Sequence, residues 1–162
     1  MNWASLGEHT FLAVYTICLA IMCMYGLHRY ALLYLYWRHR RKYQRPKRRF
    51  DTLPRVTIQL PMYNELQVAR RIIEATCEIE YPKELVDIQV LDDSTDATPE
   101  LCKQVVAEME AKGFDITYIH RTDRTGYKAG ALANGLKVAK GEFVMIFDAD
   151  FVPAKSTLRR TI

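Results

Sequence analysis

The stretch Phe143-Val144-Met145-Ile146-Phe147-Asp148-Ala149-Asp150 joins an apolar run to two aspartates that are one residue apart. Residues 143–147 are apolar and long enough to predict a fully buried β-strand. A strand that ends in Asp-x-Asp places two carboxylates at the carboxyl edge of a sheet, where ligands of open α/β folds bind. Two acids there repel each other unless a cation lies between them, and Mg²⁺ takes one or two carboxylates together with phosphate and water oxygens. The stretch therefore indicates a metal site; the alternative is a strand followed by an acidic turn.

Strands and helices alternate along the part of the chain that leads to this stretch. Apolar runs and helical spacing predict strands over residues 56–60, 85–91, 116–120 and 143–147, and helices over residues 65–79, 98–112 and 126–140. The second helix has Thr98 as its expected N-cap and Pro99 at its first helical position. Strands separated by helical crossovers predict an α/β fold, with a parallel sheet and helices on both faces.

Polar segments follow the predicted strands and should meet at one edge of the sheet, because the carboxyl ends of parallel strands lie together. These segments are residues 61–65, 92–96, 121–130 and 148–150. Acids with a nearby lysine and flexible glycines suit a nucleotide diphosphate with a bound metal. Each segment alone also fits a turn, a solvated lysine or a packing glycine. The first strand lacks a Gly-x-Gly-x-x-Gly fingerprint and the chain lacks a Gly-x-x-x-x-Gly-Lys-Ser/Thr loop, which argues against a dinucleotide-binding enzyme.

The amino-terminal residues have the composition of a membrane span. Residues 1–28 contain no Lys or Arg and one acid, Glu8. Residues 10–27 are uncharged and would rise about 27 Å as a helix, close to the hydrocarbon thickness of a bilayer. Residues 30–37 add Leu and four aromatics, which suit the interfacial end of the same helix. A signal peptide is the alternative, but its basic residues would precede the apolar core. We therefore predict an extracytoplasmic amino terminus and a transmembrane helix over residues 1–37.

Basic residues crowd the carboxyl side of this predicted span. Residues 38–49 hold eight Lys or Arg, and we expect residues 38–53 to be a basic cytoplasmic linker. Because Lys and Arg mark the cytoplasmic side, the amino terminus should lie outside. The basic run also suits contact with anionic membrane lipids. Residues 50–162 hold 14 basic and 18 acidic residues, which argues against a nucleic-acid partner for this part.

Four motifs in order carry a family resemblance. They are QLPMYNE at residues 59–65, VLDDSTD at 90–96, RTGYKAGAL at 124–132 and FDADFVP at 147–153. This series resembles the family 2 inverting glycosyltransferases, and within them the membrane-bound cellulose synthase-like and mannan or glucan synthase-like enzymes. The resemblance covers about residues 54–155. It implies a GT-A fold over residues 54–162, a UDP- or GDP-linked sugar donor, and transfer of a hexose with inversion to extend a polysaccharide.

The resemblance also implies roles for particular residues. Tyr63, Asn64 and Glu65 would border the nucleotide. Asp92 or Asp93, together with Asp96, would hold the base and ribose. Lys128 would contact the nucleotide. The carboxylates of Asp148 and Asp150 would coordinate Mg²⁺ or Mn²⁺ on the diphosphate, where the metal stabilises the departing nucleotide as a Lewis acid.

The chain departs from the family pattern at its carboxyl end. The family's general base, an Asp in a Thr-Glu-Asp or similar motif, and its Gln-x-x-Arg-Trp motif would lie beyond Ile162. We therefore expect no catalytic residue in this chain, which would be the amino-terminal fragment of a longer enzyme with an open sheet edge. Two alternatives keep the fold: transfer of one sugar to a lipid acceptor instead of a glycan, and a non-catalytic nucleotide-binding module. No motif predicts a partner subunit.

Overall fold

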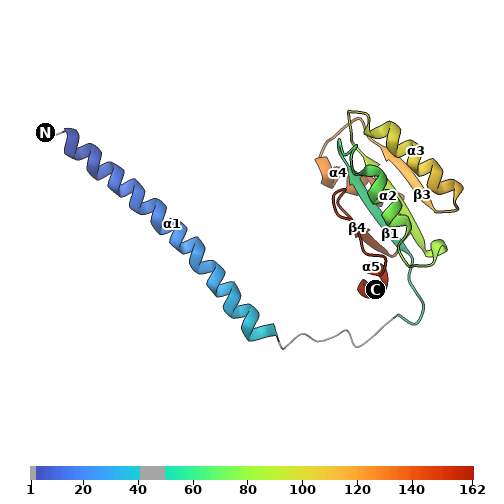
Figure 1. Cartoon of the computed structure of the whole chain (residues 1–162), viewed down its shortest axis with the longest axis horizontal. Coiled ribbons are helices and arrows are strands. Elements are labelled where there is room, and N and C mark those ends of the chain that lie inside the picture. The colour runs from blue at the N-terminus through green and yellow to red at the C-terminus, as the bar shows by residue number, and fades with distance from the viewer. Residues whose placement is uncertain (1–2, 41–49) are drawn as a thin grey trace. The chain divides into compact units, whose positions relative to one another are not determined.

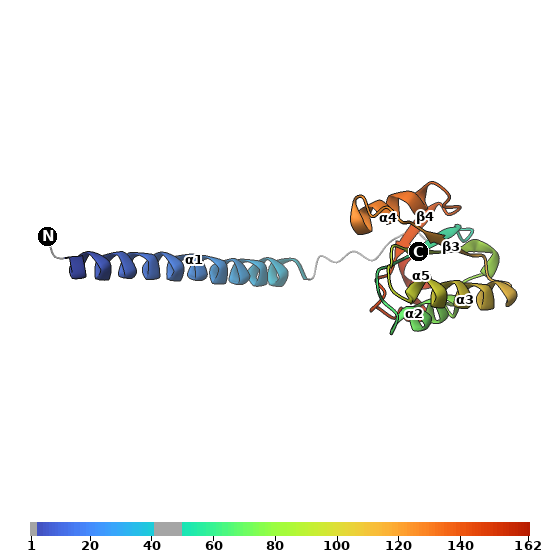
Figure 2. The same ribbon diagram turned by 90° about the horizontal axis from the view of Figure 1, so that it is seen from above.

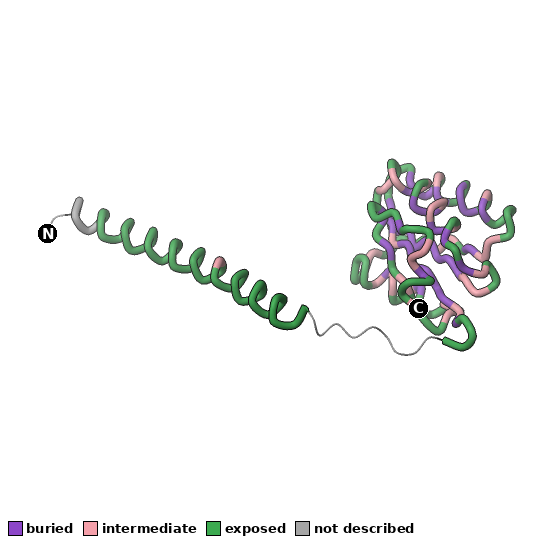
Figure 3. Tube along the Cα trace, turned by 60° about the horizontal axis from the view of Figure 1, so that its bottom comes forward, coloured by how far each residue is buried: buried purple, intermediate pink, exposed green. Residues whose placement is uncertain are grey.

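The computed structural model describes residues 3–40 and 50–162, and the chain divides into two compact units, Met1–Arg48 and Arg49–Ile162. The first unit contains one long helix, α1 (Trp3–His39; Figure 1). Nearly all residues between 7 and 40 are exposed (Figure 3). The segment Gly7–His39 has a mean hydropathy of 2.0 and is long and apolar enough to cross a membrane. The two predicted parts of the span therefore form one uninterrupted helix. Most of the predicted basic linker lies outside the described residues.

The second unit is built on a parallel sheet, as the sequence predicted. In the described residues its strands are β1 (Val56–Met62), β2 (Val86–Asp92), β3 (Ile116–His120) and β4 (Phe143–Ile146), in the order β3-β2-β1-β4. Met62 pairs with Asp92, and Asp92 pairs with His120, so these strands end level with one another. The carboxyl ends of the first three strands therefore form one edge.

Helices cover both faces of this sheet (Figure 2). Helices α2 (Ala69–Cys77) and α3 (Thr98–Ala111) lie on one face, and α4 (Tyr127–Leu136) lies on the other. A 3₁₀ turn, η2 (Lys83–Leu85), precedes β2, and a short helix, α5 (Thr157–Thr161), follows β4.

Two predicted helices are shorter than the sequence suggested. Helix α2 begins at Ala69 instead of residue 65, because the backbone N–H groups of Val68 and Ala69 both donate to the carbonyl of Glu65 in a turn. Helix α4 ends at Leu136 instead of residue 140, since the next residues form turns that bond three residues back. Helical spacing alone continues through such turns, so it does not mark these ends.

The start of α3 corrects another prediction. Thr98 is the first helical residue and not the N-cap, which is Ala97. The Asp96 carboxylate instead accepts a hydrogen bond from the Thr98 backbone N–H at 2.9 Å. Asp96 therefore satisfies a free amide in the first turn of α3, as an N-cap side chain does. Pro99 is therefore the second helical residue, one position later than predicted, and still lies in the first turn.

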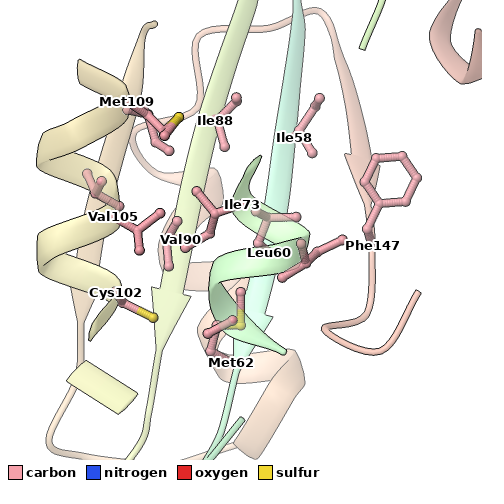
Figure 4. Packing of buried hydrophobic residues seen from close by; sticks show 14 of the residues in the cluster. Ile58, Leu60, Met62, Ile73, Ile88, Val90, Cys102, Val105, Met109 and Phe147 are labelled. Atoms are coloured by element: carbon pink, nitrogen blue, oxygen red, sulfur yellow. The ribbon is translucent and has the colours of Figure 1, made fainter. Parts of the chain in front are cut away.

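An apolar core lies between the sheet and the pair α2 and α3 (Figure 4). Its side chains come from alternate positions of β1 and β2 and from the inner faces of the two helices, including Ile58, Leu60, Ile73, Val90 and Val105, each 0% exposed. Cys102 belongs to this cluster, and burial raises the pKa of its thiol to about 12. The core fixes the strands whose ends carry the polar segments.

The opposite face of the sheet has a polar layer beneath α4. Thr57 and Gln59 of β1 and Asp87 and Gln89 of β2 are each at most 1% exposed. Thr57 Oγ1 donates to Asp87 Oδ2 at 2.9 Å, and Gln59 Nε2 donates to Gln89 Oε1 at 3.0 Å. The Gly141 N–H donates to Thr57 Oγ1 at 2.8 Å. This layer holds the connection between α4 and β4 against the sheet.

Strand β4 is not fully buried, contrary to the prediction from its apolar run. Phe143, Val144 and Ile146 are 39–45% exposed, because β4 is the edge strand next to β1. An apolar run of this length does not distinguish a central strand from an edge strand. Phe147, just after the strand, is buried in the core at 5% exposure. The strand end that carries Asp148 and Asp150 is thus anchored by Phe147.

Candidate functional site

A pocket of about 270 Å³ lies where the carboxyl ends of the strands meet the start of α4. It is lined by Pro61, Met62, Tyr63, Glu65, Asp93, Lys128, Ala131, Asp148, Ala149 and Asp150. Six of the nine residues predicted for the site are therefore in its wall. Asn64, Asp92 and Asp96 do not line it. The predicted convergence of four separate segments is confirmed for the segments after β1, β2 and β4 and for the start of α4.

Asn64 joins two of these segments. Its backbone has φ 55°, in the left-handed region that asparagine tolerates better than most residues. Its Oδ1 accepts a hydrogen bond from the Thr95 N–H at 2.9 Å, and its own N–H donates to Ser94 Oγ at 2.8 Å. The loop after β1 is thereby fixed to the loop after β2. Asn64 supports the pocket by holding Tyr63 and Glu65 in its wall.

Asp92 is buried behind the pocket at 1% exposure. Its Oδ1 accepts the Ser94 N–H at 2.9 Å, and its Oδ2 accepts the hydroxyl of Tyr118 at 2.6 Å. His120 Nδ1 lies 3.6 Å from the same Oδ2. Burial and then the bond to Asp92 raise the pKa of Tyr118 above its ordinary value. Both oxygens of Asp92 are thus occupied within the protein, and Asp93 is the carboxylate that faces the pocket.

Asp93 accepts two hydrogen bonds from Arg121, a residue that the sequence did not single out. Arg121 donates from Nε to Asp93 Oδ1 at 2.9 Å and from Nη2 to Asp93 Oδ2 at 2.5 Å. The same guanidinium donates to the carbonyls of Thr125 and Tyr127, at 3.4 and 3.1 Å. The bonds to Asp93 raise the pKa of Arg121. Arg121 therefore ties the segment before Lys128 to the loop after β2. One signal in the sequence could have found it. Arg121 directly follows a predicted strand, as the acidic pair Asp92 and Asp93 follows another.

Arg124 is a second arginine that the sequence did not single out. Its guanidinium carbon lies 3.4 Å from the centre of the Tyr63 ring and 5.4 Å from that of Tyr127. Such stacking of a guanidinium on an aromatic face is attractive. Tyr127 has φ 48° and follows Gly126 at φ 75°, so the chain turns sharply into α4. The stack fixes this turn against the loop after β1.

The two carboxylates of the Asp-x-Asp motif can supply part of the ligands of a metal ion, with the rest coming from a bound molecule and water. Asp148 and Asp150 both line the pocket, and no cluster of three or more His, Cys, Asp or Glu residues suitable for a metal occurs in residues 3–40 and 50–162. A cation held by two carboxylates needs further oxygen ligands, which phosphate and water supply to Mg²⁺ and Mn²⁺. The residues therefore fit a divalent cation that is bound together with a diphosphate. Lys128 Nζ forms an ion pair with Asp148 Oδ1.

Asp96 lies outside the pocket, at the start of α3. Hydrogen bonding from Thr98 to the Asp96 carboxylate lowers the pKa of that carboxyl. Its position suits the helix start, and its predicted contact with the nucleotide stays a prediction.

Comparison with known proteins agrees with this geometry. The family described as Glycosyl transferase family 2 matches residues 57–162. Glucomannan 4-beta-mannosyltransferase 7 of Arabidopsis thaliana is 46% identical over 113 residues, which are 67% of this chain and 20% of that protein. Glucomannan 4-beta-mannosyltransferase 1 of Oryza sativa subsp. japonica is 47% identical over 116 residues, 69% of this chain and 22% of that protein. The chain thus matches about a fifth of the length of these curated relatives.

A solved structure shows the same fold. Mannosyltransferase PcManGT from Pyrobaculum calidifontis, in complex with GDP-Man and Mn²⁺, is 34% identical and has a TM-score of 0.67, over 86% of this chain and 41% of that one. The parallel sheet, the family match and this neighbour agree on a GT-A-like nucleotide-sugar fold. The chain belongs to glycosyl transferase family 2.

Proposed function

We propose that residues 54–162 form the donor-binding part of an inverting glycosyltransferase whose donor is GDP-mannose. The observation that carries the proposal is the single pocket that contains Asp93, Lys128, Asp148 and Asp150. Between UDP- and GDP-linked sugars, the names of the relatives and the GDP-Man in the solved neighbour favour GDP-mannose. Because the chain matches about a fifth of the length of those relatives, sugar transfer by the whole protein is itself part of the proposal.

Each pocket residue has a proposed task that follows from its position. Asp148 and Asp150 would hold Mn²⁺ or Mg²⁺, which supplies Lewis-acid stabilisation of the departing nucleoside diphosphate. Lys128 would pair with phosphate oxygens through its ammonium group. Asp93, oriented by Arg121, would accept hydrogen bonds from the base or ribose. Tyr63 and Glu65 border the same space, with Asn64 behind them.

The amino-terminal part would place this pocket at a membrane. We propose that α1 spans the bilayer, with residues 1–37 carrying the outer end and the span, and residues 38–53 forming the basic cytoplasmic linker. The length and hydropathy of Gly7–His39 support the span, and the basic run after it supports a cytoplasmic pocket. A membrane-bound enzyme of this kind would extend a polysaccharide such as a mannan or glucomannan.

Isothermal titration of the detergent-solubilised chain tests the donor assignment. We expect GDP-mannose to bind in the presence of Mn²⁺ at least ten times more tightly than UDP-glucose. Asp148→Asn should weaken this binding, whereas Asp115→Asn, which breaks an ion pair with Lys140 away from the pocket, should leave it unchanged. Equal binding of the two donors would contradict the GDP-mannose assignment. Binding unaffected by Asp148→Asn would contradict the site.

A further inference from the structure

Lys128 and Asp148 form an ion pair inside the proposed donor pocket. Lys128 Nζ contacts Oδ1 of Asp148, and both residues line the pocket beside Asp150. The carboxylate proposed to hold a divalent cation is therefore already in contact with a cationic side chain. Among the described residues that line this pocket, Lys128 is the one that carries a positive charge.

The exposure and flexibility of this ion pair allow its two side chains to separate. The side chains of Lys128 and Asp148 are 52% and 59% exposed, and ion pairs with this exposure contribute little to stability. Lys128 is the second residue of α4, so its backbone is held while its flexible four-carbon stem lets the ammonium move. The Asp148 backbone is likewise held, because its carbonyl accepts the Phe151 N–H at 2.9 Å, and its side chain is much shorter than that of Lys128. The ammonium is therefore the mobile partner.

The other cations around the site have partners of their own. The Arg121 guanidinium is occupied by Asp93 and two carbonyls, and that of Arg124 is stacked on Tyr63. An ammonium group and a divalent cation repel each other strongly at contact distance in a partly enclosed site. Asp148 therefore cannot serve Lys128 and a metal through the same oxygen. Even on the second oxygen, a metal would lie close enough to the ammonium for the two cations to disfavour each other.

We propose that Lys128 and the divalent cation compete for Asp148, and that a nucleoside diphosphate ends the competition by taking the Lys128 ammonium onto its phosphate oxygens. This inference rests on the proposed donor site. In the free protein Lys128 weakens metal binding. When the diphosphate binds, Asp148 is released for the metal, and the phosphates add oxygen ligands. Metal and nucleotide thus bind cooperatively, and each raises the affinity of the other by the same factor.

Free Mn²⁺ measured by electron paramagnetic resonance tests this competition in the full chain in detergent. Mn²⁺ is titrated into the protein with and without GDP. The Mn²⁺ that GDP binds in the absence of protein is measured separately and subtracted. Without GDP, Lys128→Gln should raise the Mn²⁺ affinity about fivefold or more, the lower end of typical coupling between sites. Adding GDP should raise the Mn²⁺ affinity of the wild type and have a much smaller effect in the variant.

A matched control separates this effect from a general change in charge. Lys155 pairs with Glu78 at 3.0 Å with similar exposure, 64% and 62%, and lies outside the pocket. Lys155→Gln should therefore leave the Mn²⁺ affinity as in the wild type. Lys128→Met repeats the test with a second neutral side chain, and circular dichroism confirms that each variant is folded.

The outcomes distinguish the inference from the proposed function. If Asp148→Asn keeps the GDP-dependent Mn²⁺ site, the donor site itself is wrong. If Asp148→Asn abolishes that site but neither Lys128 variant binds Mn²⁺ more tightly without GDP, the donor site stands and the competition is overturned. Tighter GDP-free binding in both Lys128 variants, absent in Lys155→Gln, supports the competition.

Discussion

Arg121 holds Asp93 through two hydrogen bonds, from Nε to Oδ1 at 2.9 Å and from Nη2 to Oδ2 at 2.5 Å. The two side chains are 16% and 5% exposed, so the pair is largely shielded from water. The paired geometry fixes the carboxylate plane that faces the pocket. Because the same guanidinium also binds the carbonyl of Tyr127, it couples Asp93 to the residue before Lys128.

Arg121→Met should therefore impair both folding and donor binding. Removing the guanidinium fork, with its two hydrogen bonds to Asp93, leaves this carboxylate without its partner. We expect a loss of about 1–3 kcal/mol in the free energy of unfolding. GDP affinity should fall about tenfold or more as Asp93 loses its orientation. Arg121→Lys keeps the charge but not the fork, so it should recover only part of the affinity. Urea denaturation measures the loss of stability, and titration calorimetry measures the loss of GDP affinity. Undiminished GDP binding in Arg121→Met would contradict the proposed role of Arg121 in orienting Asp93.

Asn64 allows its backbone conformation and its side-chain bond to be tested separately. Asn64→Gly keeps access to φ 55° but loses the bond to the Thr95 N–H, which should cost about 1 kcal/mol. Asn64→Ala loses the bond and also strains the left-handed backbone, which adds about 1 kcal/mol. Thermal unfolding should therefore rank the wild type above Asn64→Gly and Asn64→Ala last. Equal stability of the two variants would show that the backbone conformation carries no strain.

Large-to-small substitutions in the core beneath the pocket should destabilise the protein as they do in a close-packed interior. Leu60 is 0% exposed between the sheet and α2, whereas Leu136 at the end of α4 is 54% exposed. Leu60→Ala should lower the free energy of unfolding by about 2–5 kcal/mol. Leu136→Ala, the matched control, should change it by less than about 0.5 kcal/mol. Similar losses at both positions, measured in urea, would contradict the assigned core.

The contact between α2 and α3 predicts a pH dependence. Arg70 Nη1 lies 2.8 Å from Glu108 Oε2, and the hydrogen bonds from Arg70 lower the pKa of the Glu108 carboxyl from 4.5 to about 2. A carboxyl whose pKa is lower in the folded state stabilises the fold above its unfolded pKa and loses that effect as the pH falls. The stability difference between the wild type and Glu108→Gln should be full above about pH 4.5 and vanish towards pH 2.

Thermal unfolding between pH 7 and pH 2 follows this difference. Glu110→Gln on the same helix is the control, and it should differ from the wild type by an amount that does not follow this profile. A difference for Glu108→Gln that stays constant down to pH 2 would contradict the assigned ion pair.

Much of the second unit could be predicted from sequence, for identifiable physical reasons. Strand β2 and strand β3 are bounded by turn residues, so short apolar runs located them to within a residue. The exposure of β4 could not be predicted, because it depends on the strand's place at the sheet edge and not on its own composition. The order of strands is set by tertiary packing.

Several residues that line the candidate pocket could be predicted from their residue type and position. Asp148, Asp150 and Lys128 were found from their charges at a strand end and a helix start. Asp92 and Asp93 are adjacent, and only the structure shows that Tyr118 and Ser94 occupy the first and Arg121 holds the second. Arg124 was missed because stacking on Tyr63 joins residues far apart in sequence. Such contacts leave no local pattern.

The position of Mn²⁺ in a GDP-bound crystal, located by anomalous scattering, tests the central claim most directly. The account predicts a Mn²⁺ ion about 2.2 Å from a carboxylate oxygen of Asp148 or Asp150 and in contact with the diphosphate. Lys128 Nζ should then lie on a phosphate oxygen instead of Asp148. A Mn²⁺ ion bound elsewhere, or GDP bound outside the pocket between Tyr63, Asp93 and Asp148, would contradict the donor site.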